Sequence, residues 1–383
     1  MLPTLVPPTT ELPERTHALR AQVREFLAAE QAAGAWSPRV DVWLTGWDER
    51  FSRELARRGW IGMTIPVEYG GHGASALDRY VVTEELLAAG APVAAHWVAD
   101  RQIGPSLLRH GTEAQRRRFL PGIAAGEVYF GIGMSEPDSG SDLASVRSRA
   151  VRVDGGWSLT GTKVWTSGAH HAHAFFALVR TSPRDDAKRH AGLSQLIVEL
   201  DAPGVTIRPI ELLTGAHHFN EVVFDEVFVA DDMVLGEVGE GWQQVTGELA
   251  FERSGPERFL STFPLLRALV AELAGTTAAR REVGAMVARL WTLRRMSLAV
   301  AGALAAGEAP ELAAAVVKDL GTRFENEIVD AARLLAAVPP DPGAESGFAR
   351  LLADAVLQAP GFTLRGGTNE VLRGIVARGM GLR

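Results

Sequence analysis

The sequence predicts an α+β protein in which a helical segment, a β-rich segment and a second helical segment follow one another. The apolar residues recur at helical spacing up to about residue 125, at strand-like spacing after that, and again at helical spacing beyond about residue 236. The chain has 383 residues, of which 46% are hydrophobic and 22% charged, so it is long enough for two or three packed modules. We therefore expect domains at residues 1–125, 126–235 and 236–383.

The first segment reads as a helical domain from Glu14 to about Ala125. Its apolar residues recur three or four positions apart, as in Leu19, Val23 and Phe26, and glycine or proline separates the stretches. This spacing places the apolar side chains on one face of each helix. The segment is thus expected to consist of several amphipathic helices.

The middle segment begins near Gly126 and is expected to form strands. Residues 150–153 and 157–164 flank Asp154-Gly155-Gly156, a sequence that is typical of a tight hairpin turn. Further strands are expected at 174–181, 193–200 and 221–229. The segment therefore predicts a β domain.

The last segment returns to helices after the glycine-rich stretch from Gly236 to Gly241. Its strongest helical patterns span residues 285–305 and 311–337. The prolines of Pro339-Pro340-Asp341-Pro342 interrupt it once, and the residues after Pro360 are expected to form a loop that leads into a last short helix.

Composition excludes several classes of function. The net charge is −7 and Arg116-Arg117-Arg118 is the longest basic run, which does not fit a nucleic-acid-binding surface. The chain has no cysteine, so it has no disulfides, thiolate nucleophiles or cysteine-ligated metals. Residues 1–10 lack the basic and apolar parts of a leader peptide, and no apolar stretch approaches about 18 residues. We expect a soluble, cytoplasmic protein that does not bind membranes.

Two motifs in the middle segment carry the chemistry. The first is Met134-Ser135-Glu136-Pro137-Asp138-Ser139-Gly140-Ser141-Asp142, and the second is Thr162-Lys163-Val164-Trp165-Thr166-Ser167-Gly168. Gly131 and Gly133 begin a G-x-G pattern, but Glu136 occupies the place of the third glycine, so the motif is no dinucleotide fingerprint. Taken singly, the serines could form a simple turn and Trp165 could be core packing. Their order along the chain instead favours a cofactor site.

These motifs resemble those of the acyl-CoA dehydrogenases, and the resemblance extends along nearly the whole chain. Three further segments agree with the family in order and spacing: Arg58–Gly62 with Pro66 and Glu68–Gly73, Gly236–Trp242, and Gly366–Val371 with Arg373 and Ala377-Arg378. The resemblance implies an N-terminal helical domain, a central antiparallel β-barrel-like domain and a C-terminal domain of the four-helix-bundle type. It also implies an oxidoreductase that binds FAD.

The resemblance assigns the flavin-binding residues one by one. Met134 and Ser135 would touch the pyrimidine edge of the ring, and Ile132 is a further expected cofactor-binding residue. Ser141 would reach the pyrophosphate, which needs hydroxyl or backbone N–H donors. Trp165 would cover the ring, and Ser167 would lie near the nitrogen that accepts the hydride. Thr368 and Glu370 would contact the flavin from the terminal loop.

The catalytic base departs from the commonest family pattern. In many members a glutamate immediately precedes the Gly-Thr of the terminal loop, where this chain has Gly366. Other members, resembling isovaleryl-type dehydrogenases, carry the base on the first helix of the last domain, and Glu252 matches that site. The alternative is that Glu252 only forms an ion pair on a helix surface. By resemblance, the backbone N–H of Gly366 would bind the thioester oxygen, and the missing side chain leaves room for branched, bulky or ring-bearing acyl groups.

Two family motifs that reach a neighbouring subunit's flavin are not recognisable. Ala271–Gly275 keeps only the glycine of Arg-x-x-Phe-Gly, and the proline break occupies the region expected to hold Gln-x-x-Gly-Gly. A mixed tetramer with a second family member would supply these groups in trans. A homodimer or homotetramer that uses other residues, such as Arg280 or Arg281, is the alternative.

The leading hypothesis is an FAD-dependent acyl-CoA dehydrogenase that passes electrons to an electron-transferring flavoprotein. The acyl group is expected on coenzyme A or on a carrier protein. An acyl-CoA oxidase or flavin monooxygenase with the same scaffold is one alternative, and a non-catalytic subunit of a mixed complex is another. Arg147, Arg152 and Arg208 could meet coenzyme A phosphates or simply be solvated. The paired histidines lack the acidic or cysteine partners of a metal site, so no metal is expected.

Overall fold

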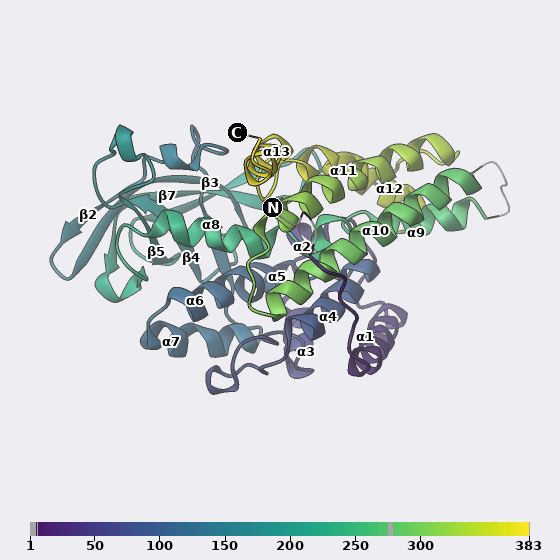
Figure 1. Cartoon of the computed structure of the whole chain (residues 1–383), viewed down its shortest axis with the longest axis horizontal. Coiled ribbons are helices and arrows are strands. Elements are labelled where there is room, and N and C mark those ends of the chain that lie inside the picture. Colours follow the sequence, from purple (N-terminus) through teal and green to yellow (C-terminus); the bar gives the residue numbers. More distant parts are fainter. Residues whose placement is uncertain (1–4, 6, 275–278, 383) are drawn as a thin grey trace. The chain divides into compact units, whose positions relative to one another are not determined.

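The chain folds into two compact units that each draw on separate stretches of sequence. The computed structural model describes residue 5 and residues 7–274 and 279–382. Unit 1 comprises Met1–Gly46, Ala74–Val93 and Ala250–Arg383, and unit 2 comprises Trp47–Gly73 and Ala94–Leu249. The expected order along the chain is confirmed, because helices come first, strands follow, and helices return (Figure 1).

Unit 1 is helical. Its N-terminal helices are α1 (Arg15–Ala32), α2 (Val42–Thr45) and α4 (Ala76–Ala89), and its C-terminal helices are α9 (Phe263–Glu272), α10 (Arg280–Ala305), α11 (Glu311–Leu335), α12 (Gly347–Phe362) and α13 (Asn369–Gly379). Helix α11 packs against α10, α12 and α13, and α4 packs against α1 and α10. The expected helix at 285–305 begins five residues earlier, and the one at 311–337 ends two residues earlier.

Unit 2 combines helices with one sheet. Its helices are α3 (Glu49–Arg57), α5 (Ala94–Val98), α6 (Gly104–His110), α7 (Glu113–Ala124) and the first nine residues of α8 (Gly241–Glu252). Its strands are β1 (Phe130–Gly133), β2 (Arg149–Val153), β3 (Gly156–Ser167), β4 (Ala174–Arg180), β5 (Leu193–Glu199), β6 (Val205–Glu211), β7 (His217–Ala230) and β8 (Val234–Leu235). The expected hairpin is present, because β2 and β3 pair antiparallel from Val153↔Gly156 onward.

The sheet is open, and this corrects the expected antiparallel barrel. The strand order is β6-β7-β3-β2-β4-β5-β8, with β1 pairing β4, and the described residues contain no ladder between the edge strands β6 and β8. Because β8 is only two residues long, it offers too few hydrogen bonds to close the sheet. The sheet is also mixed, since β1 runs parallel to β4 and β2 meets β4 in parallel at Arg149↔Arg180.

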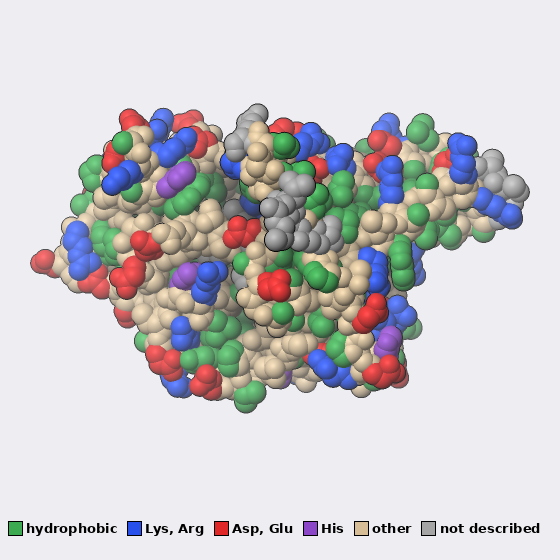
Figure 2. All heavy atoms as spheres, in the orientation of Figure 1, with side chains coloured by type: hydrophobic (Ala, Val, Ile, Leu, Met, Phe, Trp, Pro, Cys, Tyr) green, Lys and Arg blue, Asp and Glu red, His purple; other side chains and the backbone are tan. Residues whose placement is uncertain are grey.

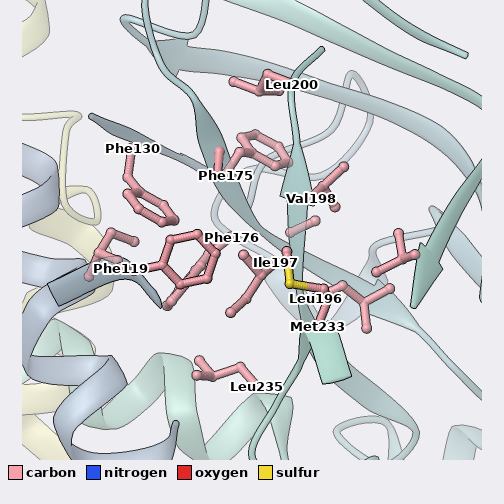
Figure 3. Packing of buried hydrophobic residues seen from close by; sticks show 14 of the residues in the cluster. Phe119, Phe130, Phe175, Phe176, Leu196, Ile197, Val198, Leu200, Met233 and Leu235 are labelled. Atoms are coloured by element: carbon pink, nitrogen blue, oxygen red, sulfur yellow. The ribbon is translucent and has the colours of Figure 1, made fainter. Parts of the chain in front are cut away.

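The main core of unit 2 combines side chains of this sheet with side chains of helix α7. Figure 3 shows Phe130 of β1, Phe175 and Phe176 of β4, and side chains of β5 packed together with Phe119 of α7. A Cβ added to Gly133 would lie 1.9 Å from Cζ of Phe175, so only glycine lets β1 approach this ring. The core thereby fixes the end of β1, where the first motif begins.

One face of the molecule shows a mixed distribution of charge. On the face shown in Figure 2, acidic and basic side chains are interspersed. None of the helices in the described ranges is long and apolar enough to span a membrane.

Candidate flavin and thioester site

The two motifs of unit 2 meet through backbone and side-chain bonds. Val164 N–H donates to the carbonyl oxygen of Ser135 at 3.0 Å. The ammonium group of Lys163 donates to the carbonyl oxygen of Met134 at 3.2 Å and to Oε1 of Glu136 at 2.8 Å. The structure therefore places the first motif directly beside the second half of β3.

A buried ion pair holds this junction together. The side chain of Lys163 is fully buried and that of Glu136 is 7% exposed. Burial lowers the pKa of Lys163 to about 8, against the attraction of Glu136. Burial would raise the pKa of Glu136, but the charge of Lys163 and the N–H groups of Arg147 and Ser148, at 2.6 and 2.9 Å, hold it below its ordinary value. The sequence analysis missed this pair, although both residues lie within the two motifs.

Trp165 has a strained backbone and an open face. Its φ of 61° lies in the left-handed region, where a bulky residue is rare, and the register between β3 and β7 shifts between Lys163 and Thr166. The residue is 55% exposed, and its ring packs edge to face on Phe219, with centroids 5.8 Å apart. Strain of this kind is characteristic of functional sites. The ring is thus available to a flat partner and is not core packing.

Strain at Trp165 predicts an unusual ranking of substitutions. We expect Trp165→Gly to be more stable than Trp165→Ala by about 1 kcal/mol, because alanine keeps the cost of positive φ and glycine does not. Val151 on β2 is equally exposed and has ordinary strand geometry, so there the glycine variant should be the less stable one. Urea unfolding of the four variants measures both differences. The same ranking at both positions would show that Trp165 carries no strain.

The serines of the two motifs have unused hydrogen-bonding capacity. The hydroxyl groups of Ser135, Ser141 and Ser167 make no hydrogen bond to any residue in the described ranges, and Ser141 is exposed. Ile132 and Met134 are half-buried and pack against the core clusters of unit 2. Free hydroxyls and an exposed indole are the donor set and the flat surface that an isoalloxazine and its pyrophosphate need. These residues of unit 2 fit FAD.

The remaining predicted residues lie in unit 1, around a segment that we call the glycine turn (Gly366–Gly367). These two glycines have φ values of 67° and 93°. The carbonyl oxygen of Gly366 accepts from Nε of Arg253 at 3.3 Å, and that of Gly367 accepts from Nζ of Lys318 at 2.5 Å. The N–H groups of both glycines have no hydrogen-bond acceptor among the described residues. The turn therefore presents two free donors.

Thr368 and Glu370 follow the glycine turn at the start of α13. The Thr368 hydroxyl oxygen caps the helix by accepting from Val371 N–H at 3.3 Å. Glu370 is exposed, and its own backbone N–H and the Thr368 hydroxyl lower the pKa of its carboxyl. Glu252 is the last residue of α8, and its side chain lies outside the described part of the chain.

A second buried charge network, which the sequence did not reveal, anchors Arg365 beside the glycine turn. Its guanidinium donates to Oδ1 of Asp41 at 2.5 Å, to Oγ of Ser261 at 2.8 Å and to Oε2 of Glu325 at 3.2 Å. Complete burial raises the pKa of Glu325 to about 7, although Arg365 and the bond from Ser261 N–H oppose this. The only signal in the sequence is that Arg365 directly precedes Gly366.

The raised pKa of Glu325 predicts a pH-dependent stability. Below its ordinary value of 4.5 the carboxyl is protonated in the folded and unfolded states alike. Between about pH 4.5 and 7 only the folded state keeps the proton, so the free energy of unfolding should fall as pH rises, by at most about 1.4 kcal/mol per pH unit. Glu325→Gln should lack this slope.

Urea unfolding of wild type and Glu325→Gln from pH 5 to pH 8 measures the effect. Glu308→Gln, at an exposed position of unit 1, serves as the control and should follow wild type. A difference between Glu325→Gln and wild type that stays constant over this range would contradict the expectation.

The other polar clusters find partners within unit 2. Arg147, Arg152 and Arg208 form surface ion pairs with Asp138, Asp231 and Glu221. The rings of His170 and His217 stack with centroids 4.0 Å apart. Within the described ranges no group of three or more histidine or acidic side chains could hold a metal ion.

Comparisons with known proteins agree along the chain. Family profiles match the N-terminal domain of acyl-CoA dehydrogenases at residues 13–127, the middle domain at 131–227 and the C-terminal domain at 239–381. The acyl-CoA dehydrogenase IpdE1 of Mycobacterium tuberculosis is 36% identical over 375 residues, covering 94% of this chain and 95% of IpdE1. The acyl-CoA dehydrogenase FadE34 of the same organism is 35% identical over 338 residues, covering 86% of this chain, which spans about half (45%) of FadE34.

Two solved structures are also similar. The structure named Tcur3481-Tcur3483 steroid ACAD has a TM-score of 0.83 and 30% identity, with 97% of this chain and 99% of that chain covered. The ChsE4-ChsE5 complex from Mycobacterium tuberculosis has a TM-score of 0.82 and 28% identity, with 96% and 97% covered. Both resemble this chain over nearly its whole length.

Proposed function

Because the chain belongs to the acyl-CoA dehydrogenase family, whose enzymes act on the CH–CH bond of acyl-CoA, we propose that it is an FAD-dependent dehydrogenase of bulky or branched acyl thioesters. The observation that carries the proposal is the junction of the two motifs in unit 2, which presents an exposed Trp165 and free serine hydroxyls. We also propose the division into domains at 1–125, 126–235 and 236–383, which the three matched segments support.

The proposed reaction removes a proton from the α-carbon and a hydride from the β-carbon, leaving a trans-2-enoyl thioester. Glu252 accepts the α-proton on its carboxylate. The Gly366 N–H donates to the thioester oxygen and stabilises the negative charge that develops there. FAD, when bound, supplies the acceptor for the hydride. Ser135, Ser141, Trp165 and Ser167 would hold FAD. By the family resemblance, Thr368 and Glu370 would contact it as well.

The glycine at 366 supports the proposed preference for bulky acyl groups. No side chain projects from this position, so the thioester is approached by backbone alone. The similarity to a structure named a steroid ACAD points the same way. We therefore expect branched or ring-bearing acyl groups to react faster than straight short ones.

A panel of butyryl-CoA, isovaleryl-CoA, cyclohexanecarbonyl-CoA and a steroid-side-chain acyl-CoA tests the proposal. The purified protein should be yellow and, with an artificial electron acceptor, should form products two hydrogen atoms lighter than the substrates, detected by mass spectrometry. No enoyl product from any member would overturn the dehydrogenase assignment. Rapid peroxide formation in air would indicate an oxidase instead.

We propose an electron-transferring flavoprotein as electron acceptor and a mixed tetramer with a second family member as the assembly. The loss of both family motifs that act in trans supports this, as does the similarity to a structure described as the ChsE4-ChsE5 complex. Native mass spectrometry of the chain alone, and of the chain coexpressed with a family member encoded by a neighbouring gene, tests this assembly. A stable, flavin-loaded homotetramer of the chain alone would contradict the mixed assembly.

A further inference from the structure

Arg365 stands directly before the glycine turn, and its guanidinium is buried and bonded to three residues. Its side chain is 10% exposed, and its two terminal nitrogens bond to Asp41, Ser261 and Glu325. Asp41 and Glu325 are buried to 2% and 0% exposure. A planar guanidinium that bonds acceptors in several directions is fixed in position and in rotation.

The acceptors come from three separate segments of unit 1. Asp41 lies just before α2, Ser261 lies in the segment before α9, and Glu325 lies in the middle of α11. Ser261 N–H in turn donates to Oε1 of Glu325 at 2.9 Å, and Asp41 N–H donates to the carbonyl oxygen of Ser261 at 3.1 Å. The three acceptors are therefore tied to one another as well as to Arg365.

Two further features restrain the same site. The guanidinium lies over the rings of Trp43 and Phe362, 4.7 and 4.9 Å from their centroids. Asp41 is held at a φ of 60°, a left-handed conformation that is uncommon outside glycine. A strained backbone conformation persists only where neighbouring groups hold it. One of the groups that hold Asp41 is the guanidinium of Arg365.

We propose that Arg365 is a positioning residue that sets the direction of the Gly366 N–H toward the thioester oxygen. The Arg365 carbonyl and the Gly366 N–H belong to one peptide plane, so anchoring the Arg365 side chain at one end of that plane limits its rotation. Glycine at 366 and 367 would otherwise leave the plane loose. The inference rests on the proposed function, in which that N–H binds the substrate carbonyl.

The test compares two ligands that differ at the carbonyl oxygen. The first is the enoyl-CoA product of the best substrate in the panel above. The second is the matching S-(2-alkenyl)-CoA thioether, which has CH2 in place of the carbonyl group. Binding to flavin-loaded protein is measured by calorimetry, without turnover. In Arg365→Met the affinity for the thioester should fall about tenfold, the loss of one well-placed hydrogen bond, while the affinity for the thioether stays unchanged. Arg365→Lys keeps the positive charge but not the planar set of donors of the guanidinium. Its affinity for the thioester should therefore fall by an intermediate factor.

Arg294→Met is the matched control. Arg294 forms a partly buried ion pair with Glu84 of α4, at 2.6 and 3.0 Å, and within the described ranges it makes no hydrogen bond or ion pair with the glycine turn. This variant should lose stability without changing the ratio of the two affinities. If Arg365→Met does not fold, Arg365→Lys and Glu325→Gln provide the same comparison, with a smaller shift of the ratio in each.

The outcomes separate the inference from the function on which it rests. Equal losses for thioester and thioether in the Arg365 variants, or no loss for either, would overturn the positioning role while wild-type dehydrogenation stands. A wild-type protein that forms no enoyl product would overturn the proposed function itself. A wild-type protein that forms product but binds both ligands equally would overturn the inference, because the Gly366 N–H would then make no hydrogen bond to the thioester oxygen.

Discussion

Glu252→Gln should abolish turnover while FAD stays bound. The amide has nearly the shape of the carboxylate but cannot accept the α-proton, and a general base contributes about 10²–10⁴-fold to the rate. We expect kcat to fall by about 10³-fold or more, with the flavin absorbance of the purified protein unchanged. Exchange of the α-hydrogen of the substrate with deuterated water should be lost as well, which isolates the proton step from hydride transfer.

Glu248→Gln is the matched control for this prediction. Glu248 and Glu252 lie four residues apart on α8, so the same change is made one helical turn earlier. This variant should keep at least about half of the wild-type rate, since its position does not match the family's base. If Glu252→Gln retained that much activity, the base would have to lie elsewhere.

Lys163→Met should destabilise unit 2 and reduce flavin binding. Breaking a buried ion pair costs about 3–5 kcal/mol, because the remaining charge stays buried without its partner. Here the remaining group is the Glu136 carboxylate, which would keep only the N–H groups of Arg147 and Ser148. Urea unfolding at pH 7 gives the loss of stability, and flavin absorbance per mole of protein gives the loss of cofactor.

The double variant Lys163→Met/Glu136→Gln distinguishes the charge from the packing. It should recover part of the stability, since no unpaired charge is left, but little of the flavin, since the bond to the Met134 carbonyl is still missing. Lys188→Met changes an exposed lysine of the same unit and should behave as wild type. A Lys163→Met protein of wild-type stability would mean that the pair contributes nothing to the fold.

Much of the fold could be predicted from the spacing of apolar residues, and the exceptions have physical reasons. The hairpin of β2 and β3 and the long helices α10 and α11 follow from repeated patterns that packing does not override. Strand β6 was missed because it contains Pro209, which is tolerated at a sheet edge but weakens a strand pattern. Closure of the sheet depends on whether its two edge strands pair, and the spacing of apolar residues within a strand does not predict such pairing.

The candidate site also contains residues that the sequence predicts and residues that it does not. The resemblance of the two motifs indicated the serines and Trp165, whereas nothing local identified the buried charges that hold them. Lys163 and Glu136 are 27 residues apart, and Arg365 and Asp41 are 324 apart. A charged residue destined for burial looks the same in sequence as a solvated one until its partner is known.

The positive φ of Gly366 also limits how this enzyme could be redesigned. The family resemblance places the commoner base at this position, so Gly366→Glu would be the direct way to introduce that arrangement. At a φ of 67° a glutamate would bear the steric penalty of the left-handed backbone, about 1–2 kcal/mol. The direction of its side chain would also be set by this left-handed turn. Placing the catalytic carboxylate at position 366 would therefore require a different loop conformation as well as the Gly366→Glu substitution.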